Sequence, residues 1–314
     1  MARKPRIEFP GALNHVLARG NRKEKVFLSD DDFQKYLALL SIYKKRYSFK
    51  LYAYALMANH LHLLLETSSV PLSRIMQGLQ QSYTQFYNRK YEKVGHVFQG
   101  RYKAIICQED VYLLELVRYV HLNPVRAGID NIEDFPWTSY HCYLSEKGND
   151  LVDTTVVLSL FGKDKKSARS LFKRFIYEGL ALGRQEKFYA VREQRVLGNE
   201  DFVEGVLEKE VGEEIKVEKK TGKVSLKEIA EAVGKRWNVL PAMIKTRLKN
   251  REVTLCRRWF IYLARVYHGY TLKEIAAFLG SDISTITKNA KIMVDKMKNN
   301  QRLASEAVRL AEDR

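Results

Sequence analysis

The chain has 314 residues, too many for one domain of average size, so we expect at least two domains. A composition that is 46% hydrophobic and 11% aromatic excludes a disordered chain. The 54 Lys and Arg residues against 37 Asp and Glu leave a net charge of +17, which favours a polyanionic partner. Nucleic acid is the leading candidate, and a membrane surface is compatible with the charge alone.

We expect neither a secretion signal nor a membrane span in this chain. The first six residues are basic, but the apolar segment of a signal peptide does not follow them. No stretch reaches the roughly 18 apolar residues of a membrane span. We therefore expect a cytoplasmic, nucleoid-associated protein with no membrane partner.

The first 145 residues alternate short β-patterned runs with amphipathic helical runs. This rhythm is typical of an α+β domain with a split βαβ arrangement. Ser29 and the acidic residues after it predict the start of a helix, and so does Pro71. The runs predict, in chain order, a strand over residues 14–19, a helix over 30–46, strands over 49–57 and 61–66, and a helix over 71–89.

The next run, residues 97–108, predicts a hairpin or a strand bent around Gly100. A third helix is expected from Asp110. It should end near Asn123, because Pro124 pushes the preceding residue out of helical geometry.

Residues 146–222 predict an all-α connector that ends in a linker. Short helices are expected over residues 156–161, 168–182 and 201–210. The stretch 212–223 is highly charged and has no aromatic residue, which is typical of a linker.

Two later segments repeat one pattern, SLKEIAEAVG at residues 225–234 and TLKEIAAFLG at residues 271–280. In each, a Ser or Thr is followed three residues later by Glu, which predicts a capping box, and a Gly ends the helix. The second segment runs directly into another helical pattern, residues 283–297, as in a helix-turn-helix. We therefore expect a helix-turn-helix domain over residues 223–299 and a C-terminal tail over 300–314.

Four residues of the first domain form a candidate catalytic set. His60 and His62 are two apart on a predicted strand, so their side chains share a face and can converge on one metal ion. Tyr119 and Asn123 are four apart on a predicted helix and also share a face. Each residue alone has an ordinary explanation, such as packing or helix capping. The combination of a nucleophile with three possible ligands points to a catalytic site.

Three sequence blocks closely resemble the REP-associated tyrosine transposases in order and spacing, namely LMANHLHLLLE (56–66), GRYKA (100–104) and RYVHLNPVRAG (118–128). HVLARGNR (15–22) and FPWTSY (135–140) are also similar to that family. The resemblance covers roughly the first 145 residues. It implies that residues 1–145 form a ferredoxin-like HUH nuclease domain with an antiparallel sheet.

The same resemblance implies roles for the four residues. His60, His62 and Asn123 would bind a divalent metal, Mg or Mn, although imidazole ligands alone would favour zinc. Tyr119 would attack a phosphodiester, nick single-stranded DNA and keep a 5'-phosphotyrosine from which the strand can be transferred. Hairpin-forming repeats are the expected substrate. Ala58 departs from the pattern, where a proline commonly precedes the Asn-His pair, but no ligand is replaced.

Basic residues next to these motifs are candidates to hold the DNA backbone. They are Arg19, Arg22, Lys23, Arg101, Lys103, Arg118 and Arg126. Tyr83, Phe86 and Tyr87 either offer stacking faces for unpaired bases or, at their helical spacing, form a core stripe. The sequence leaves both alternatives open.

Two further blocks, KNREVTLCRRWFIYLAR (249–265) and LKEIAAFLGSDISTI (272–286), resemble the DNA-binding domain of the replication initiator DnaA. That resemblance implies a basic helix-turn-helix that reads duplex DNA in the major groove. The implied contact residues are Arg257, Ser281, Asp282, Ser284, Thr285 and Lys288. Ser281 and Ile283 replace an Arg and a His usual in the loop, so duplex binding carries over more safely than a sequence preference. A helical domain for protein contacts is the alternative.

Together these features predict a metal-dependent tyrosine transposase that nicks and transfers single-stranded DNA with its first domain and binds duplex DNA with its last. The alternative is a non-catalytic DNA-binding regulator that uses the same two domains. Both a monomer and a homodimer are compatible with the sequence.

Overall fold

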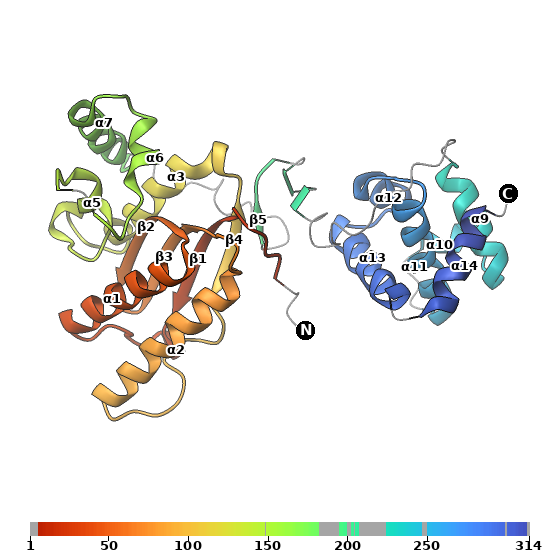
Figure 1. The fold of residues 1–314 in the computed structure, drawn as a ribbon, viewed down its shortest axis with the longest axis horizontal. Helices are drawn as coiled ribbons and strands as arrows, with labels where there is room; N and C mark the ends of the chain where they lie inside the picture. The colour runs from red at the N-terminus through yellow and green to blue at the C-terminus, as the bar shows by residue number, and fades with distance from the viewer. Residues whose placement is uncertain are drawn as a thin grey trace. The chain divides into compact units, whose positions relative to one another are not determined.

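The computed structural model describes residues 6–147, 149–181, 195–199, 202–203, 205–206, 224–246, 250–298 and 300–312. The chain divides into two compact units, one formed by Glu8–Asn199 and the other containing residues 200–314 (Figure 1). No helix within the described ranges is long and apolar enough to cross a membrane.

The first unit is built on a ferredoxin-like arrangement of strands and helices. Its elements are β1 (Leu13–Arg19), α1 (Asp30–Tyr47), β2 (Lys50–Met57), β3 (His60–Glu66), α2 (Leu72–Lys90) and β4 (Lys103–Cys107). These four strands lie in the order β2-β3-β1-β4 and all neighbours are antiparallel. The predicted α+β fold is therefore confirmed, and the predicted strands and helices match the observed ones within one or two residues.

Helices α1 and α2 lie side by side against the sheet (Figure 1). Buried aromatic rings fill the contact between them. The rings of Tyr36 and Tyr83 meet edge to face at 5.2 Å between centroids, and neither side chain is exposed. The helices approach closely at Gly78, where a Cβ would lie 2.5 Å from the ring of Tyr43. Only glycine avoids that overlap, which explains this residue inside a helix.

Helix α3 (Glu109–His121) packs against β2 and β3 and is followed at once by the short helix α4 (Asn123–Arg126). The prediction that the helix stops near Asn123 is thus correct for α3, but the chain turns into another helical segment. Pro124 occupies one of the first two positions of α4, where the missing N–H of proline is tolerated. Residues 97–108 contain a single strand, β4, and Phe98 forms an isolated bridge with Gly20 instead of a hairpin arm.

A fifth strand was not expected from the sequence. β5 (Val196–Leu197) pairs with β4 in parallel, which makes the sheet mixed rather than purely antiparallel. The backbone N–H groups of Ile106 and Gln108 donate to the carbonyls of Arg195 and Leu197 at 2.7 and 2.9 Å. This pairing places residues 195–199 in the first unit.

Residues 140–178, which include the start of the predicted connector, also belong to this unit. They form α5 (Tyr140–Leu144), α6 (Thr154–Ser159) and α7 (Lys165–Glu178). The ring of Phe172 in α7 stacks on Tyr143 in α5 at 4.5 Å and is fully buried. The boundary that we predicted at residue 145 therefore does not coincide with the compact unit, because the apolar face of α7 is buried against α3 and α5. Most of the helix expected over residues 201–210 lies outside the described residues.

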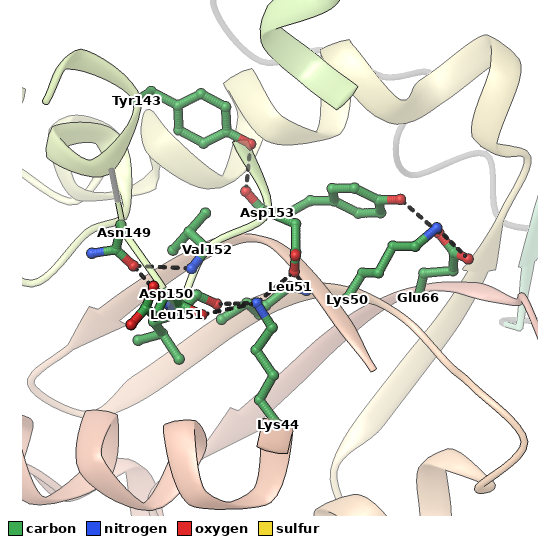
Figure 2. A network of polar contacts seen from close by, with 11 residues as sticks. Lys44, Lys50, Leu51, Glu66, Tyr143, Asn149, Asp150, Leu151, Val152 and Asp153 are labelled. Carbon is green, nitrogen blue, oxygen red and sulfur yellow. Dashed lines mark hydrogen bonds and ion pairs between the residues drawn. The ribbon is translucent and has the colours of Figure 1, made fainter. Parts of the chain in front are cut away.

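A polar network ties the loop before α6 to the start of β2 (Figure 2). The carboxylate of Asp153 accepts a hydrogen bond from the Leu51 N–H at 2.7 Å. It also forms an ion pair with the Lys44 ammonium at 2.7 Å. The Lys44 ammonium also donates to the carbonyls of Asp150 and Leu151 at 3.1 and 3.0 Å. The loop is thereby held against both α1 and β2.

The second unit is helical. It contains α9 (Leu226–Trp237), α10 (Pro241–Ile244), α11 (Arg251–Val266), α12 (Leu272–Leu279), α13 (Ile283–Lys298) and α14 (Gln301–Glu312). Both predicted capping boxes are confirmed, because Glu228 and Glu274 accept from the backbone N–H of Ser225 and Thr271. Gly280 ends α12 in the left-handed region at φ 58°, and α13 follows in a helix-turn-helix. The predicted tail contains α14, which packs on α9, α11 and α13.

Candidate active site

Three histidines share one face of the sheet. In the pairing of β1 with β3, His60 is opposite Arg19, His62 opposite Leu17, and Leu64 opposite His15. Because side chains alternate along a strand and paired residues point the same way, His15 lies on the face that carries His60 and His62. His15 and His62 are buried, with 5% and 3% exposure, whereas His60 is half-buried.

Each of the two histidines predicted as ligands has a partner at Nδ1. Nδ1 of His60 lies 2.6 Å from Oδ1 of Asn59, to which it donates a hydrogen bond. Nδ1 of His62 lies 3.0 Å from Nε2 of His15. Nε2 of His60 is then free to bind a metal ion. Nε2 of His62 is also free to bind it when Nδ1 of His62 carries the proton.

The environment keeps these imidazoles neutral. Burial and, secondarily, the charges of His15 and His60 lower the pKa of His62 well below its usual value. Burial and the charge of Arg19 lower the pKa of His60. Burial and the charge of Lys103 lower the pKa of His15 to about 4. A neutral imidazole is the form that binds a metal ion, so near pH 7 no proton must first be displaced from these rings.

Tyr119 lies beside this group on α3. Its half-buried ring meets the ring of His15 edge-on at 5.6 Å and the ring of His62 at 6.3 Å between centroids. His60 and His62 in turn lie 5.3 Å apart, ring to ring. The structure thus brings together a phenol and the two imidazoles that the sequence paired with it. The guanidinium of Arg126 lies 5.1 Å from the centroid of the Tyr119 ring.

Asn123 lies one helical turn after Tyr119. Its side-chain Nδ2 donates to the carbonyl of Tyr119 at 2.9 Å, which leaves Oδ1 as the atom that could bind a metal. In the part of the chain that the structure describes, no group of three or more His, Cys, Asp or Glu side chains could hold a metal ion. Two imidazoles and one amide remain the donor set predicted from the sequence. Such a set suits a loosely held divalent ion with positions left open for phosphate and water.

Exposed basic side chains lie beside the site. Arg19 and Lys103 are exposed and belong to the same sheet face as the histidines, since Lys103 pairs with Leu17 and Arg19 with His60. Arg22, Lys23, Arg101 and Arg126 are also exposed. Six of the seven basic residues proposed from the sequence therefore lie where a DNA backbone could reach them.

Arg118 is different from the other six. It is 8% exposed, its guanidinium pairs with Glu115 at 2.7 Å, and it lies 4.2 Å from the ring centroid of Phe175. It also donates to the Phe175 carbonyl at 3.4 Å. This arginine joins α3 to α7, so we remove it from the proposed DNA contacts.

The aromatic stripe on α2 is mostly core. Tyr83 is fully buried and its hydroxyl donates to the Val26 carbonyl, while Tyr87 is 5% exposed and donates to the Lys25 carbonyl. Phe86 is half-buried, with the ammonium groups of Lys35 and Lys90 above its ring. The core alternative therefore holds for the two tyrosines.

In the second unit the proposed contacts gather at the start of α13. Asp282, Thr285 and Lys288 are exposed and Ser281 is half-exposed, while the Ser284 side chain lies outside the described residues. Arg257 is engaged within the unit, because its guanidinium donates to the carbonyls of Ile244 and Thr246. It is a bridge from α11 to α10 as well as a candidate for DNA contact.

His15 is the residue of the site that our sequence reasoning did not assign. The block HVLARGNR contains it, but no local spacing rule connects it to His62. The two histidines are 47 residues apart and meet only because β1 pairs with β3 in this register. The available signal was a histidine within an apolar strand. That signal is weak by itself, since buried histidines often serve packing alone.

Comparisons with known proteins find two families that match separate parts of the chain. Residues 11–123 match the family described as "Transposase IS200 like", and residues 226–292 match "Bacterial dnaA protein helix-turn-helix". The chain is thus similar to IS200-like transposases over residues 11–123 and to the DnaA helix-turn-helix over residues 226–292. Both resemblances seen in the sequence are confirmed over these residues, and a transposase-like function is supported.

Individual relatives cover parts of the chain. The chromosomal replication initiator protein DnaA of Wolinella succinogenes is 29% identical over 112 residues, and that of Campylobacter concisus is 29% identical over 86 residues. These matches cover 31% and 27% of this chain but 24% and 20% of the relatives, so the chain spans about a quarter of their length or less. A solved structure of a REP-associated tyrosine transposase bound to a REP hairpin aligns with 16% identity and a TM-score of 0.42, covering 48% of this chain and 90% of that one.

Proposed function

We propose that this protein is a tyrosine transposase whose first unit nicks single-stranded DNA through Tyr119 and transfers the cut strand. The observation that carries the proposal is the edge-on approach of the Tyr119 ring to His62, at 6.3 Å between centroids, beside His60. The match of residues 11–123 to a transposase family supports the same class of function.

In the proposed reaction the phenol oxygen of Tyr119 attacks the phosphorus of a DNA phosphodiester. The bond from phosphorus to the 3' oxygen breaks, and the upstream strand leaves with a free 3' hydroxyl. The downstream strand stays on Tyr119 through its 5' phosphate. The proton that the phenol loses balances the proton that the leaving oxygen gains. Because the phosphate ester is conserved, another 3' hydroxyl can attack the phosphotyrosine and join the strands.

The residues that would hold a Mg or Mn ion are His60 and His62 through Nε2 and Asn123 through Oδ1. When bound, such an ion withdraws charge from the phosphate oxygens and helps align the phosphorus with the nucleophile. The protein itself keeps the imidazoles neutral, holds the phenol in a half-buried position and places cations on the sheet face that carries the histidines. Arg19, Lys103 and Arg126 would neutralise phosphate charge and hold the strand in register.

The substrate of the first unit is proposed to be single-stranded DNA next to a hairpin, because the motifs around the site resemble those of REP-associated tyrosine transposases. The second unit is proposed to bind duplex DNA through the start of α13. Its match to the DnaA helix-turn-helix supports DNA as the partner. A basic chain with a net charge of +17 is consistent with two DNA-binding surfaces.

A covalent-adduct assay tests the proposal. The protein is mixed with Mn²⁺ and 3'-labelled oligonucleotides that contain hairpin-forming repeats, and the products are separated on a denaturing gel. We expect a slow band that carries the label, and a loss of about 10³-fold or more in its rate of formation in Tyr119→Phe. Tyr177→Phe is the matched control, because it removes the same oxygen from a tyrosine of α7 whose hydroxyl bonds to Glu133 and which is not in the proposed catalytic set.

Two results would contradict the proposal. One is adduct formation by Tyr119→Phe at the rate of the parent protein. The other is the absence of any adduct while a native gel shows the hairpin bound, which would favour a DNA-binding regulator without catalysis.

A further inference from the structure

We infer that His15 is a positioning residue, which accepts a hydrogen bond from Nδ1 of His62 and so leaves Nε2 of His62 with the lone pair that binds the metal ion. The inference rests on the proposed function, because it needs His62 to be a ligand. It adds a residue with a defined chemical task to the site.

The contact between the two histidines is direct and enclosed. Nε2 of His15 lies 3.0 Å from Nδ1 of His62, and the two rings are nearly parallel, with 5.3 Å between centroids and 20° between their planes. Both side chains are almost fully buried. Water therefore competes little for the hydrogen bond, and neither ring has much room to rotate.

The strand pairing fixes this contact. His62 is opposite Leu17 and His15 is opposite Leu64, so the two histidines are diagonal neighbours on one face. β1 is an interior strand, held by β3 on one side and β4 on the other. Its register cannot change without breaking both sets of backbone hydrogen bonds, so the acceptor stays at its distance from His62.

The position of one proton decides whether His62 can be a ligand. Between two neutral imidazoles the contact holds a single hydrogen. If Nε2 of His15 carried it, Nδ1 of His62 would accept, and Nε2 of His62 would carry the remaining proton and have no lone pair for a metal. If Nδ1 of His62 carries it, His15 accepts, and Nε2 of His62 is free to coordinate. Only the second arrangement is compatible with a metal on His62.

The other proposed ligand, His60, also has a hydrogen-bond acceptor at its Nδ1. Nδ1 of His60 is paired with Oδ1 of Asn59 at 2.6 Å, and an amide oxygen can only accept. Each imidazole therefore has an acceptor behind it. The acceptor for His60 is its neighbour in the chain, whereas the acceptor for His62 comes from another strand.

His15 also touches the proposed nucleophile. Its ring meets the Tyr119 ring edge-on at 5.6 Å, closer than His62 does. One buried imidazole thus packs against both a ligand and the phenol. A substitution of His15 should change metal binding because the hydrogen bond is lost. It should also change the position of the Tyr119 ring because the packing is altered. Two different substitutions can separate these effects.

The test compares His15→Gln with His15→Phe in the full-length protein. Glutamine places an acceptor oxygen near the position of Nε2, whereas phenylalanine fills the space and cannot accept. Mn²⁺ affinity is measured by electron paramagnetic resonance of the free ion, without DNA, and melting curves check the fold. We expect His15→Phe to weaken Mn²⁺ binding about 10- to 100-fold and His15→Gln to retain most of the affinity. Nitrogen-edited NMR with Mg²⁺ should show a hydrogen-bonded Nδ1–H of His62 in the parent and in His15→Gln, but not in His15→Phe.

The outcomes distinguish this inference from the proposed function. If the parent protein binds no Mn²⁺, both fall. If the parent binds and His15→Phe binds equally well with the same His62 tautomer, only the role of His15 is overturned. If Gln and Phe weaken binding equally while the melting temperatures stay close to the parent value, acceptance of a hydrogen bond is not the task of His15, and the inference is also overturned.

Discussion

The guanidinium of Arg126 lies over the ring of Tyr119, 5.1 Å from its centroid. The two residues are seven apart, and the chain passes from α3 into α4 between them. The short helix that begins at Asn123 thus carries a cation back over the proposed nucleophile. A positive charge there favours the negative charge that develops on the phenol oxygen and on the phosphate during attack.

Replacing Arg126 should therefore affect chemistry more than binding. We expect Arg126→Gln to lower the single-turnover rate of adduct formation by about 10²-fold, the typical effect of losing one group that stabilises developing charge. Hairpin affinity should fall less than tenfold, as for a lost phosphate contact. Arg89→Gln removes the same charge from an exposed position that is not among the proposed DNA contacts, and its single-turnover rate should stay near the parent value. Equal rates in the two variants would show that Arg126 holds only the backbone of the DNA.

His121 predicts a pH dependence of stability. It is fully buried among the rings of Tyr140, Tyr143 and Phe172, and its Nε2 lies 2.7 Å from the Ser139 hydroxyl. Its Nδ1 has no hydrogen-bond partner among the described residues. Burial and then the charge of His141 lower the pKa of His121 to about 3.

Because the folded pKa of His121 lies below the unfolded one, the unfolded chain takes up the proton first. Stability is fully present above pH 6.5 and should fall as the pH drops toward 3, by about 1.4 kcal/mol per pH unit from this residue. Urea denaturation at several pH values between 7 and 4 measures the slope. In His121→Gln the free energy of unfolding should fall less steeply as the pH drops, by an amount that corresponds to about one bound proton. Parallel curves of stability against pH for the two proteins would contradict the assignment.

Asp32 should be a stability residue of the first unit. Its carboxylate has no exposed surface and accepts from the backbone N–H groups of Leu28 and Ser29, the Tyr91 hydroxyl and the Lys90 ammonium. Burial by itself would raise the pKa of Asp32, but these hydrogen bonds, that of Lys90 first, lower it below the usual value. The stabilisation is therefore present above the usual aspartate pKa and is lost in acid, as the pH falls through the lower folded value.

We expect Asp32→Asn to reduce the free energy of unfolding by about 1–3 kcal/mol, because the Leu28 and Ser29 N–H groups and the Tyr91 hydroxyl lose a charged acceptor. Asp31→Asn is the matched control in the same helical turn, since its side chain is 79% exposed and 3.6 Å from Lys90. It should cost less than about 1 kcal/mol. Chemical denaturation at neutral pH compares both variants, and similar losses would show that burial of Asp32 is not what matters.

Lys288 is expected to contact a phosphate of duplex DNA. It is exposed near the start of α13, directly after the turn that follows Gly280. In Lys288→Ala, duplex affinity should fall for all sequences alike, and the slope of log affinity against log salt should decrease by about 0.9. Lys296→Ala, two turns further along the helix and also exposed, is the control with a smaller effect. An unchanged slope in Lys288→Ala would place the DNA elsewhere.

Local patterns in the sequence predicted most of the elements. The alternation in residues 60–66 and the acidic residues after Ser29 are short-range signals, and β3 and α1 follow them closely. The two capping boxes depend on residues only three apart, and both are formed. The same holds for the presentation of Tyr119 and Asn123 one turn apart, because helical spacing alone determines it.

The features that the sequence did not reveal depend on distant partners. The contact of His15 with His62 requires the register of two strands, which no local spacing encodes. Arg118 looked available to DNA, but Glu115 and Phe175 take up its guanidinium once α7 packs on α3. Pro124 marked a helix end correctly, yet the same residue can open the next helix, so the marker could not exclude α4.

The two-residue strand β5 has a practical consequence for work with fragments of this protein. It covers the outer edge of β4, the strand that leads directly into the helix of Tyr119. A fragment cut at residue 145 or 181 would lack β5 and leave the Ile106 and Gln108 amides unpaired. An uncovered strand edge recruits other chains, so such fragments would self-associate through it. An oligomer formed by a truncated first unit would then result from the truncation and not from the native assembly. A fragment that extends to Asn199 retains β5 and keeps this edge of β4 covered.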